Sequence, residues 1–97
     1  MNSSVKYSKN KYRQLERIVR GFSNHRRIQM LELLSKEPEL SVLDVSEKLK
    51  VNFKTVSEHI RRLAISGLVM KRSSGASIRH RLTERGINIL KFLRTLE

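Results

Sequence analysis

The chain has 97 residues, which is enough for one small domain with one modest hydrophobic core. Twenty-one lysines and arginines against nine acidic residues give a net charge of +12, which favours an anionic partner, nucleic acid before an acidic membrane surface or protein. The sequence has no cysteine, so disulfides, thiolate metal sites and a cysteine nucleophile are excluded.

The charge is distributed unevenly along the chain. Residues 1–27 hold eight basic residues and one acidic residue, and residues 51–81 hold seven and one. Residues 28–50 hold three basic and five acidic residues instead. This distribution indicates one directed basic face rather than charge spread for general solubility.

The N-terminal sequence has no apolar segment typical of a secretory signal, and no stretch approaches 18 apolar residues. We therefore expect a protein without a membrane partner, in the cytoplasm of a prokaryotic cell and associated with its nucleoid. Residues 1–8 are polar and aperiodic and are expected to form a flexible tail. A single domain is expected to follow over residues 9–97.

Two amphipathic helices are predicted at the start of this domain. The first covers residues 9–22, and its apolar side suits either the monomer core or a dimer seam. The cations on its other side suit either an extra phosphate contact or a solvated face. Asn24 can cap the second helix, residues 25–35. The side chains expected to be buried there are Ile28, Leu31 and Leu34.

The next two predicted helices form a helix-turn-helix. Ser41 begins the first, residues 42–49, with Asp44 three residues later in a capping-box arrangement. Asn52 and Gly67 bracket the second. Its apolar stripe is expected to face the core and consists of Phe53, Val56, Ile60, Leu63 and Ala64. The opposite side carries Lys54, Ser57, Glu58 and Arg61, with Thr55 and Arg62 at its flanks.

After Gly67 the apolar period changes from 3.6 to 2, which predicts a β-hairpin with residues 73–76 as its turn. The residues expected on its inner face are Leu68, Met70, Ile78, His80 and Leu82. Those expected on its outer face are Val69, Lys71, Arg79 and Arg81. Thr83 can cap a last helix over residues 84–96. The apolar surface of that helix is wider than one core contact requires, so part of it is expected to pack on another chain.

Three segments carry a resemblance to a known family. NHRRIQMLELL at residues 24–34 and TVSEHIRRLAISGLV at residues 55–69 resemble the first core helix and the recognition helix of ArsR-type transcriptional regulators. IRHRLTERG at residues 78–86 resembles the second wing strand and last-helix entry of ArsR-type and MarR-type proteins. The resemblance implies a winged helix-turn-helix, mainly α with a small β-hairpin. It also implies a homodimer joined by the first and last helices.

The same resemblance implies a set of site residues. The recognition helix would enter the major groove through Lys54, Thr55, Ser57, Glu58, Arg61 and Arg62. The wing would lie along the backbone or minor groove through Lys71, Arg72, Arg79 and Arg81. The dimer interface would include Tyr12, Leu15, Ile18, Val19, Ile89, Phe92, Leu93 and Leu96. Many family members sense metals through a cysteine-containing motif at the stretch SVLDVSEKL, which here has no cysteine and no histidine. The resemblance therefore carries no metal sensing across. No metal or cofactor is expected, and a small-molecule effector stays unknown.

The chemistry of the recognition residues suits DNA independently of the family. Thr55 and Ser57 are short polar groups at the end of the helix that would come closest to the bases. Arg61 suits either guanine O6 and N7 or a phosphate. Glu58 suits either a cytosine amino group or a surface ion pair with Arg62. The cations of the hairpin also suit protection of a strand edge against aggregation, with nucleic-acid contact favoured.

The three histidines do not have the spacing of a metal motif. His59 is expected at the edge of the apolar stripe and partly buried, His80 inside the hairpin, and His25 exposed. The sequence also lacks a nucleophile–base set, a paired-carboxylate pattern and a phosphate-binding glycine loop, so an enzyme is not expected.

The sequence therefore predicts a homodimeric regulator of transcription that binds double-stranded DNA at an inverted repeat. Two alternatives stay open. One is an architectural protein that binds any DNA duplex, and the other is a winged helix that binds protein or RNA.

Overall fold

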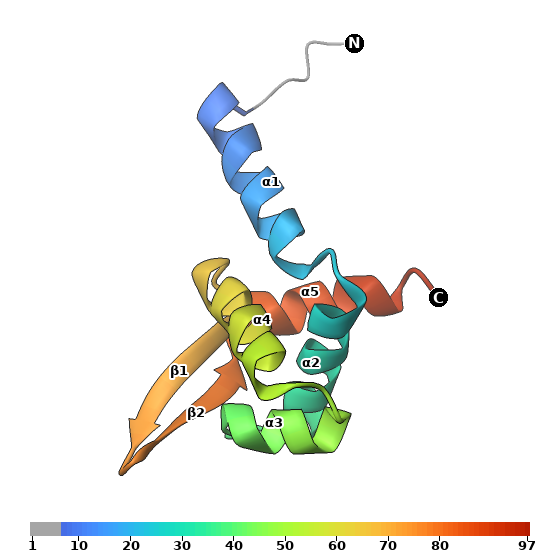
Figure 1. Ribbon diagram of the computed structural model, residues 1–97. Coiled ribbons are helices and arrows are strands. Elements are labelled where there is room, and N and C mark those ends of the chain that lie inside the picture. Colours follow the sequence, from blue (N-terminus) through green and yellow to red (C-terminus); the bar gives the residue numbers. More distant parts are fainter. Residues whose placement is uncertain (1–6) are drawn as a thin grey trace.

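The computed structural model describes residues 7–97, and within this range no helix is long and apolar enough to cross a membrane. The described elements are α1 (Lys9–Phe22), α2 (His25–Lys36), α3 (Val42–Leu49), α4 (Phe53–Ile65), β1 (Val69–Ser74), β2 (Ser77–Leu82) and α5 (Glu84–Arg94) (Figure 1). The predicted fold, mainly α with one small hairpin, is confirmed. Of the predicted flexible tail, residues 1–6 lie outside the described range. Ser8 accepts a hydrogen bond from the main-chain N–H of Lys11 and caps α1.

The helix starts follow from side-chain caps that the sequence predicts. Asn24 Oδ1 accepts from the N–H groups of Arg26 and Arg27 at 2.9 and 3.2 Å. Ser41 and Asp44 form the capping box, with both reciprocal hydrogen bonds at 3.0 Å. Each cap satisfies helical N–H groups that have no partner within the helix. Only the end of α5 differs clearly from the prediction, because the helix stops at Arg94, two residues early.

The core lies where α2 is enclosed by α1, α4, α5 and the base of the hairpin. Its buried apolar side chains are Phe22, Met30, Leu31, Leu34, Val45, Val56, Ile60, Leu63, Leu68, Val69, Leu82 and Leu90. In α2 the prediction was wrong about one position, since Met30 is fully buried while Ile28 is only half-buried. Because α2 is covered from several sides, its buried surface is wider than the single stripe that periodicity identifies.

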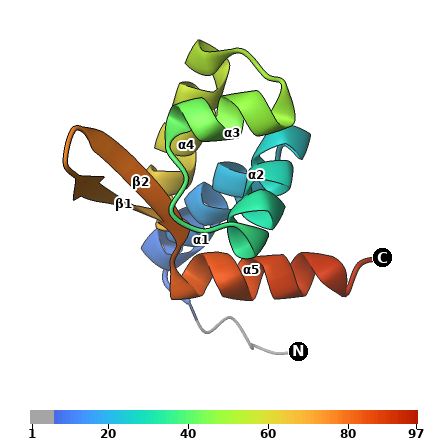
Figure 2. The same ribbon diagram turned by 90° about the horizontal axis from the view of Figure 1, so that it is seen from below.

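The hairpin is confirmed, but its faces differ from the prediction. Val69 is 3% exposed and Met70 is 45% exposed, the reverse of what alternation from Leu68 predicts. Leu68 lies before the strand, where its N–H donates to Leu63 O and its carbonyl accepts from Thr83 N. Alternation therefore begins one residue later, with Val69 paired to Leu82. Ile78 lies on the predicted face but is 47% exposed, because the hairpin extends beyond the helices there (Figure 2).

Two elements project from this body. The hairpin points away from the helices in both views (Figures 1 and 2). Helix α1 leaves the body at its C-terminal end, and it reaches the core through its C-terminal part, where Gly21 and Phe22 are buried and Ile18 packs partly against the core. The fold therefore presents one long helix and one ribbon to whatever the protein binds.

Candidate nucleic-acid interface

Helix α4 has one buried and one exposed side. Asn52 Oδ1 caps its start by accepting from the N–H groups of Lys54 and Thr55 at 2.8 and 3.2 Å. Val56, Ile60 and Leu63 are at most 1% exposed and fix the rotation of the helix against the core. All the residues predicted to read DNA from this helix are exposed: Lys54, Thr55, Ser57, Glu58, Arg61 and Arg62. Their DNA contacts remain predictions.

Phe53 was wrongly predicted to belong to the buried stripe. It is 52% exposed, although its helical spacing matches that of Val56 and Ile60. Phe53 is the first residue of α4 and lies about one turn before Val56. The apolar stripe of the sequence includes it, but the core does not extend that far along the helix. Its ring therefore adds an apolar group to the exposed end of the helix, beside Lys54 and Thr55.

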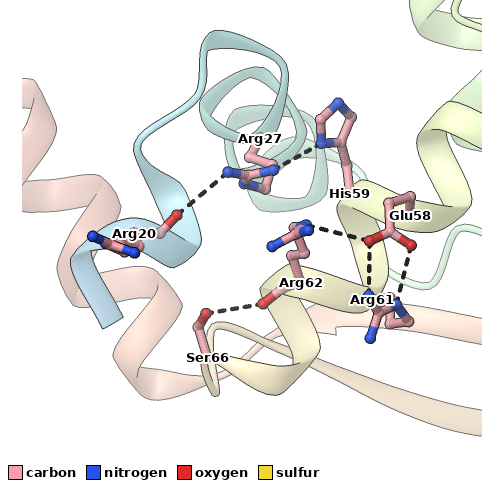
Figure 3. Close-up of polar contacts among 7 residues, drawn as sticks. All are labelled: Arg20, Arg27, Glu58, His59, Arg61, Arg62 and Ser66. Atoms are coloured by element: carbon pink, nitrogen blue, oxygen red, sulfur yellow. Dashed lines mark hydrogen bonds and ion pairs between the residues drawn. The ribbon is translucent and has the colours of Figure 1, made fainter. Parts of the chain in front are cut away.

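Glu58 holds two of the candidate DNA-binding arginines. Arg61 donates from Nε to Glu58 Oε1 at 3.1 Å and from Nη2 to Oε2 at 2.8 Å (Figure 3). Arg62 Nε lies 3.2 Å from the same Oε2. The hydrogen bonds from Arg61 lower the pKa of Glu58, and the charge of Arg62 adds to this. The surface ion pair considered for Glu58 is therefore present. All three side chains are about half exposed, so it contributes little to stability.

The four predicted wing cations are divided between the two faces of the hairpin. Pairing of Arg72 with Arg79, and of Met70 with Arg81, places three arginines on one face. Lys71 pairs with His80 and lies on the other face. The sequence pattern had placed Lys71 with Arg79 and Arg81, and this follows the same one-residue shift that buries Val69.

Glu39 gathers the three wing arginines, and sequence reasoning missed it. Arg72 donates from Nε to Glu39 Oε1 at 3.1 Å and also from Nη2 to that oxygen. Arg81 Nη1 lies 3.8 Å from Oε2, and Arg79 Nη1 donates to the main-chain carbonyl at 3.0 Å. The hydrogen bonds from Arg72 lower the pKa of the Glu39 carboxyl. The only feature of the sequence that could have pointed to Glu39 is the excess of acidic residues over residues 28–50.

The base of the wing is attached to the body next to Glu39. Glu39 N donates to His80 O at 2.8 Å, and His80 N donates to Leu40 O at 3.0 Å. His80 is 1% exposed, and its Nδ1 lies 2.8 Å from the same carbonyl. Because a carbonyl only accepts, Nδ1 must carry the proton. The burial predicted for His80 is confirmed, and its role is to hold β2 to the segment before α3.

A second polar contact joins α4 to α2 and α1. Arg27 Nη1 lies 3.0 Å from His59 Nδ1, and Arg27 Nη2 donates to Arg20 O at 3.3 Å (Figure 3). His59 is half-buried and His25 exposed, as predicted. Across residues 7–97 no three His, Cys, Asp or Glu side chains lie close enough together to hold a metal ion.

The residues predicted for the dimer interface fall into two groups. Tyr12, Leu15, Val19, Phe92 and Leu96 are between 37% and 66% exposed. Ile18, Ile89 and Leu93 instead pack partly against the protein's own core. The exposed group includes the apolar side of the projecting α1, a surface that the monomer leaves in water.

Comparison with known proteins identifies the fold and the family. The model for bacterial regulatory proteins of the arsR family matches residues 24–71. A winged helix-turn-helix DNA-binding domain from Mycobacterium bovis, described as homodimeric and as a possible ArsR-family regulator, has a TM-score of 0.84 at 24% identity, covering 99% of this chain and 89% of that one. The transcriptional regulator HlyU of Vibrio vulnificus has a TM-score of 0.72 at 27% identity, covering 91% and 92%.

An uncharacterised protein of Methanocaldococcus jannaschii is 35% identical over 60 residues, which are 62% of this chain and 22% of that protein. This chain thus spans about a fifth of the length of that relative. The family match covers α2, α3, α4 and the start of β1. The solved structures extend the similarity to the remaining elements. Residues 24–71 therefore match the ArsR family of bacterial regulatory proteins, and the whole chain has the winged helix-turn-helix fold.

Proposed function

We propose that two copies of this chain bind an inverted repeat in double-stranded DNA and regulate transcription there. The observation that carries the proposal is the exposed side of α4, which presents hydroxyls at its capped start and arginines further along. This order suits a helix whose N-terminal end reads base edges while its later residues contact phosphates. The wing adds three arginines on one face of a strand pair that continues directly from α4.

Dimerisation follows from the exposed apolar side of α1 together with Phe92 and Leu96 of α5. An apolar surface of this kind on two neighbouring helices favours association with a second copy. The homodimeric state of the M. bovis domain supports the same assembly. A two-fold dimer would place its recognition helices on half-sites about 10 base pairs apart, or a multiple of that distance.

Binding to genomic fragments, including the promoter of the protein's own gene, tests the proposal. The measurement is a gel shift with non-specific competitor DNA at salt concentrations from about 50 to 200 mM. We expect one fragment to survive competition as a discrete dimer complex. Its affinity should fall by roughly 10³-fold or more over this range if six or more phosphates are contacted. Footprinting of that complex should reveal a symmetric site.

Substitutions separate the proposal from its alternatives. Lys54→Ala and Arg61→Ala should each weaken binding to the selected fragment, while Lys91→Ala, which removes an exposed cation from α5, should not. Equal binding to every fragment would replace specific regulation with an architectural role. Duplex binding unaffected by both substitutions, or absent at low salt, would point to a protein or RNA partner instead.

A further inference from the structure

A half-open groove of about 550 Å³ lies between α1, the C-terminal end of α4 and the start of α5. Its size is that of a small-molecule site. Five of its lining residues are arginines, drawn from all three helices: Arg17, Arg20, Arg61, Arg62 and Arg85. Within residues 7–97 no acidic side chain lines it. The groove thus brings together cations that are far apart in sequence.

The cations of the groove are only partly neutralised. Arg20 Nη2 lies 3.0 Å from Glu16 Oε2. Glu58, which does not line the groove, pairs with Arg61 and Arg62 (Figure 3). These pairs are exposed to water, so they cost little to exchange for another anion. Arg85 is held differently, because its Nη1 donates to Ser66 O at 3.0 Å. The result is a cluster with more positive charge than its own carboxylates balance.

The groove also has apolar walls. Ile65 of α4 is 71% exposed, the highest value among the large hydrophobic side chains of the described chain. Ile18 of α1 is half-buried and lines the same groove. An apolar body that covered both side chains would remove hydrocarbon surface from water, which is favourable. A ligand that contacts both the arginines and the apolar walls of the groove therefore needs an anionic group and an apolar part.

Two of the residues that line the groove, Gly21 and Ser66, are in close contact. Gly21 of α1 faces Ser66 of α4, and a Cβ at position 21 would come within 1.8 Å of Ser66 Oγ. Glycine lets the two helices approach this closely. This contact holds α1 close to the end of α4 at one side of the groove.

The groove faces away from the predicted dimer seam. At about 100° per residue, Gln14, Arg17 and Gly21 of α1 point roughly 160° away from the mean direction of Tyr12, Leu15 and Val19. A second copy that packs on Tyr12, Leu15 and Val19 would leave the arginine side of the groove open, with Ile18 at the border between the two surfaces. On α4, by contrast, Arg61 and Arg62 belong to the side proposed to face DNA.

We propose that this groove binds a small amphipathic carboxylate, with its head among the arginines and its apolar body between Ile18 and Ile65. The bound carboxylate competes with DNA phosphates for Arg61 and Arg62, so it weakens DNA binding. This second part rests on the proposed function, whereas the binding of the carboxylate does not. A phosphate of DNA offers the groove similar anionic chemistry, and the experiment separates the two.

Amide chemical shifts of the ¹⁵N-labelled full chain measure the binding without DNA. The probes are butyrate, 4-phenylbutyrate and decanoate, with 4-phenylbutanol as the uncharged control. We expect saturable shifts centred on Gly21, Ser66 and Arg85 with the two larger carboxylates and none with the alcohol. Shifts spread over all basic surfaces, equal binding of the alcohol, or no saturable shift with any carboxylate would overturn the proposal.

Matched variants locate the site. Arg17→Gln should weaken 4-phenylbutyrate binding by about tenfold, as expected for one charge-assisted hydrogen bond. Arg13→Gln removes the same charge one turn earlier on α1, outside the groove, and should leave the affinity unchanged. Ile65→Ser should weaken binding, whereas Leu43→Ser, at an exposed aliphatic residue outside the groove, should not. A loss shared by Arg13→Gln and Arg17→Gln would mean non-specific attraction.

The coupling to DNA is measured separately on the fragment that the protein selects. Added 4-phenylbutyrate should weaken the complex of the wild-type chain and have little effect on that of Arg17→Gln. If the chain binds the carboxylate but binds no DNA, the carboxylate site is supported and only the proposed DNA-binding function is contradicted. If Arg17→Gln weakens DNA binding but not carboxylate binding, the groove binds a phosphate of DNA and the proposal is wrong.

Discussion

The guanidinium of Arg27 lies against the imidazole of His59, with Arg27 Nη1 3.0 Å from His59 Nδ1 (Figure 3). This contact joins α2 to the recognition helix. Because a guanidinium has only donors, His59 Nδ1 must accept and therefore carries no proton. Protonation of the ring would remove this hydrogen bond and place a second cation beside Arg27. Arg62 and His25 add to the positive surroundings, and Glu58 opposes them.

We expect the free energy of unfolding to fall as the pH drops below about 6.5, the ordinary pKa of histidine. Burial lowers the pKa of His59, with the charge of Arg27 adding to it, and burial also lowers the pKa of His80. Both rings therefore bind protons more readily in the unfolded chain. The stability is complete above the unfolded pKa and is lost as the pH falls through the folded values.

Urea denaturation at several pH values between about 7.5 and 5 measures this dependence. His59→Gln keeps a neutral hydrogen-bond acceptor and should reduce the pH dependence, while His25→Gln, at an exposed ring, should not. A pH dependence that is the same in wild type and His59→Gln would exclude His59 as a contributor.

Removing the charge of Glu39 should strengthen DNA binding. In Glu39→Gln the arginines at positions 72 and 81 lose the carboxylate that pairs with them, and their charge becomes available to phosphates. We expect roughly threefold tighter binding, mainly through faster association. Fluorescence anisotropy with the selected fragment at low and at physiological salt measures the change.

Glu37→Gln is the matched control for this prediction. Glu37 lies two residues earlier and pairs with Lys48 of α3 at 2.9 Å instead of with the wing. Its substitution removes the same charge and should change DNA affinity less. If Glu39→Gln weakens binding, Glu39 serves chiefly to position the wing arginines.

Two substitutions in the same helix should differ widely in their effect on stability. Leu63 is fully buried, so Leu63→Ala should lower the free energy of unfolding by about 2–5 kcal/mol through lost contacts and a cavity. Ile65→Ala, at a largely exposed residue two positions later, should change it by about 0.5 kcal/mol or less. Urea denaturation followed by circular dichroism compares them. Similar losses would mean that Ile65 is covered in solution.

An acidic residue in the apolar side of α1 should disrupt the dimer. Val19 is 51% exposed in the monomer, so Val19→Asp should leave the fold intact and place a charge in the seam. Light scattering coupled to size exclusion should then report one chain of 11.4 kDa instead of two. Ile87→Asp alters an exposed isoleucine of α5 outside the predicted seam and should remain dimeric. A dimer unaffected by Val19→Asp would place the interface elsewhere.

The parts of the fold that depend on neighbouring residues could be predicted from the sequence. Asn24, Ser41 and Asn52 cap the helices that they precede, because a cap needs only a side-chain acceptor and the next few N–H groups. The buried positions Val56, Ile60 and Leu63 follow from helical spacing for a similar reason. The family resemblance then supplied the arrangement of these helices around the wing.

The parts of the fold that depend on contacts between residues distant in sequence could not be predicted in this way. Phe53 fits the apolar stripe but lies past the edge of the core, and the spacing does not show where the core ends. Met70 and Val69 exchanged faces because Leu68 still belongs to the connection. Glu39 meets Arg72 only through the fold, 33 residues apart. The sequence offered the pair of Glu58 and Arg62, which lie on one helix, but it did not show that Glu39 meets the wing arginines.

The contact of Gly21 with Ser66 sets the angle at which α1 leaves the body. Helix α1 is about 21 Å long, and its buried residues lie at its C-terminal end, where Gly21 rests on Ser66. A larger side chain there would tilt the helix, and a tilt of roughly 10° would move its far end by about 3.5 Å. If α1 joins the two copies, that displacement changes the separation of their recognition helices. The preferred spacing between the two half-sites of the DNA would then depend on the absence of a side chain at Gly21, a residue that contacts no base.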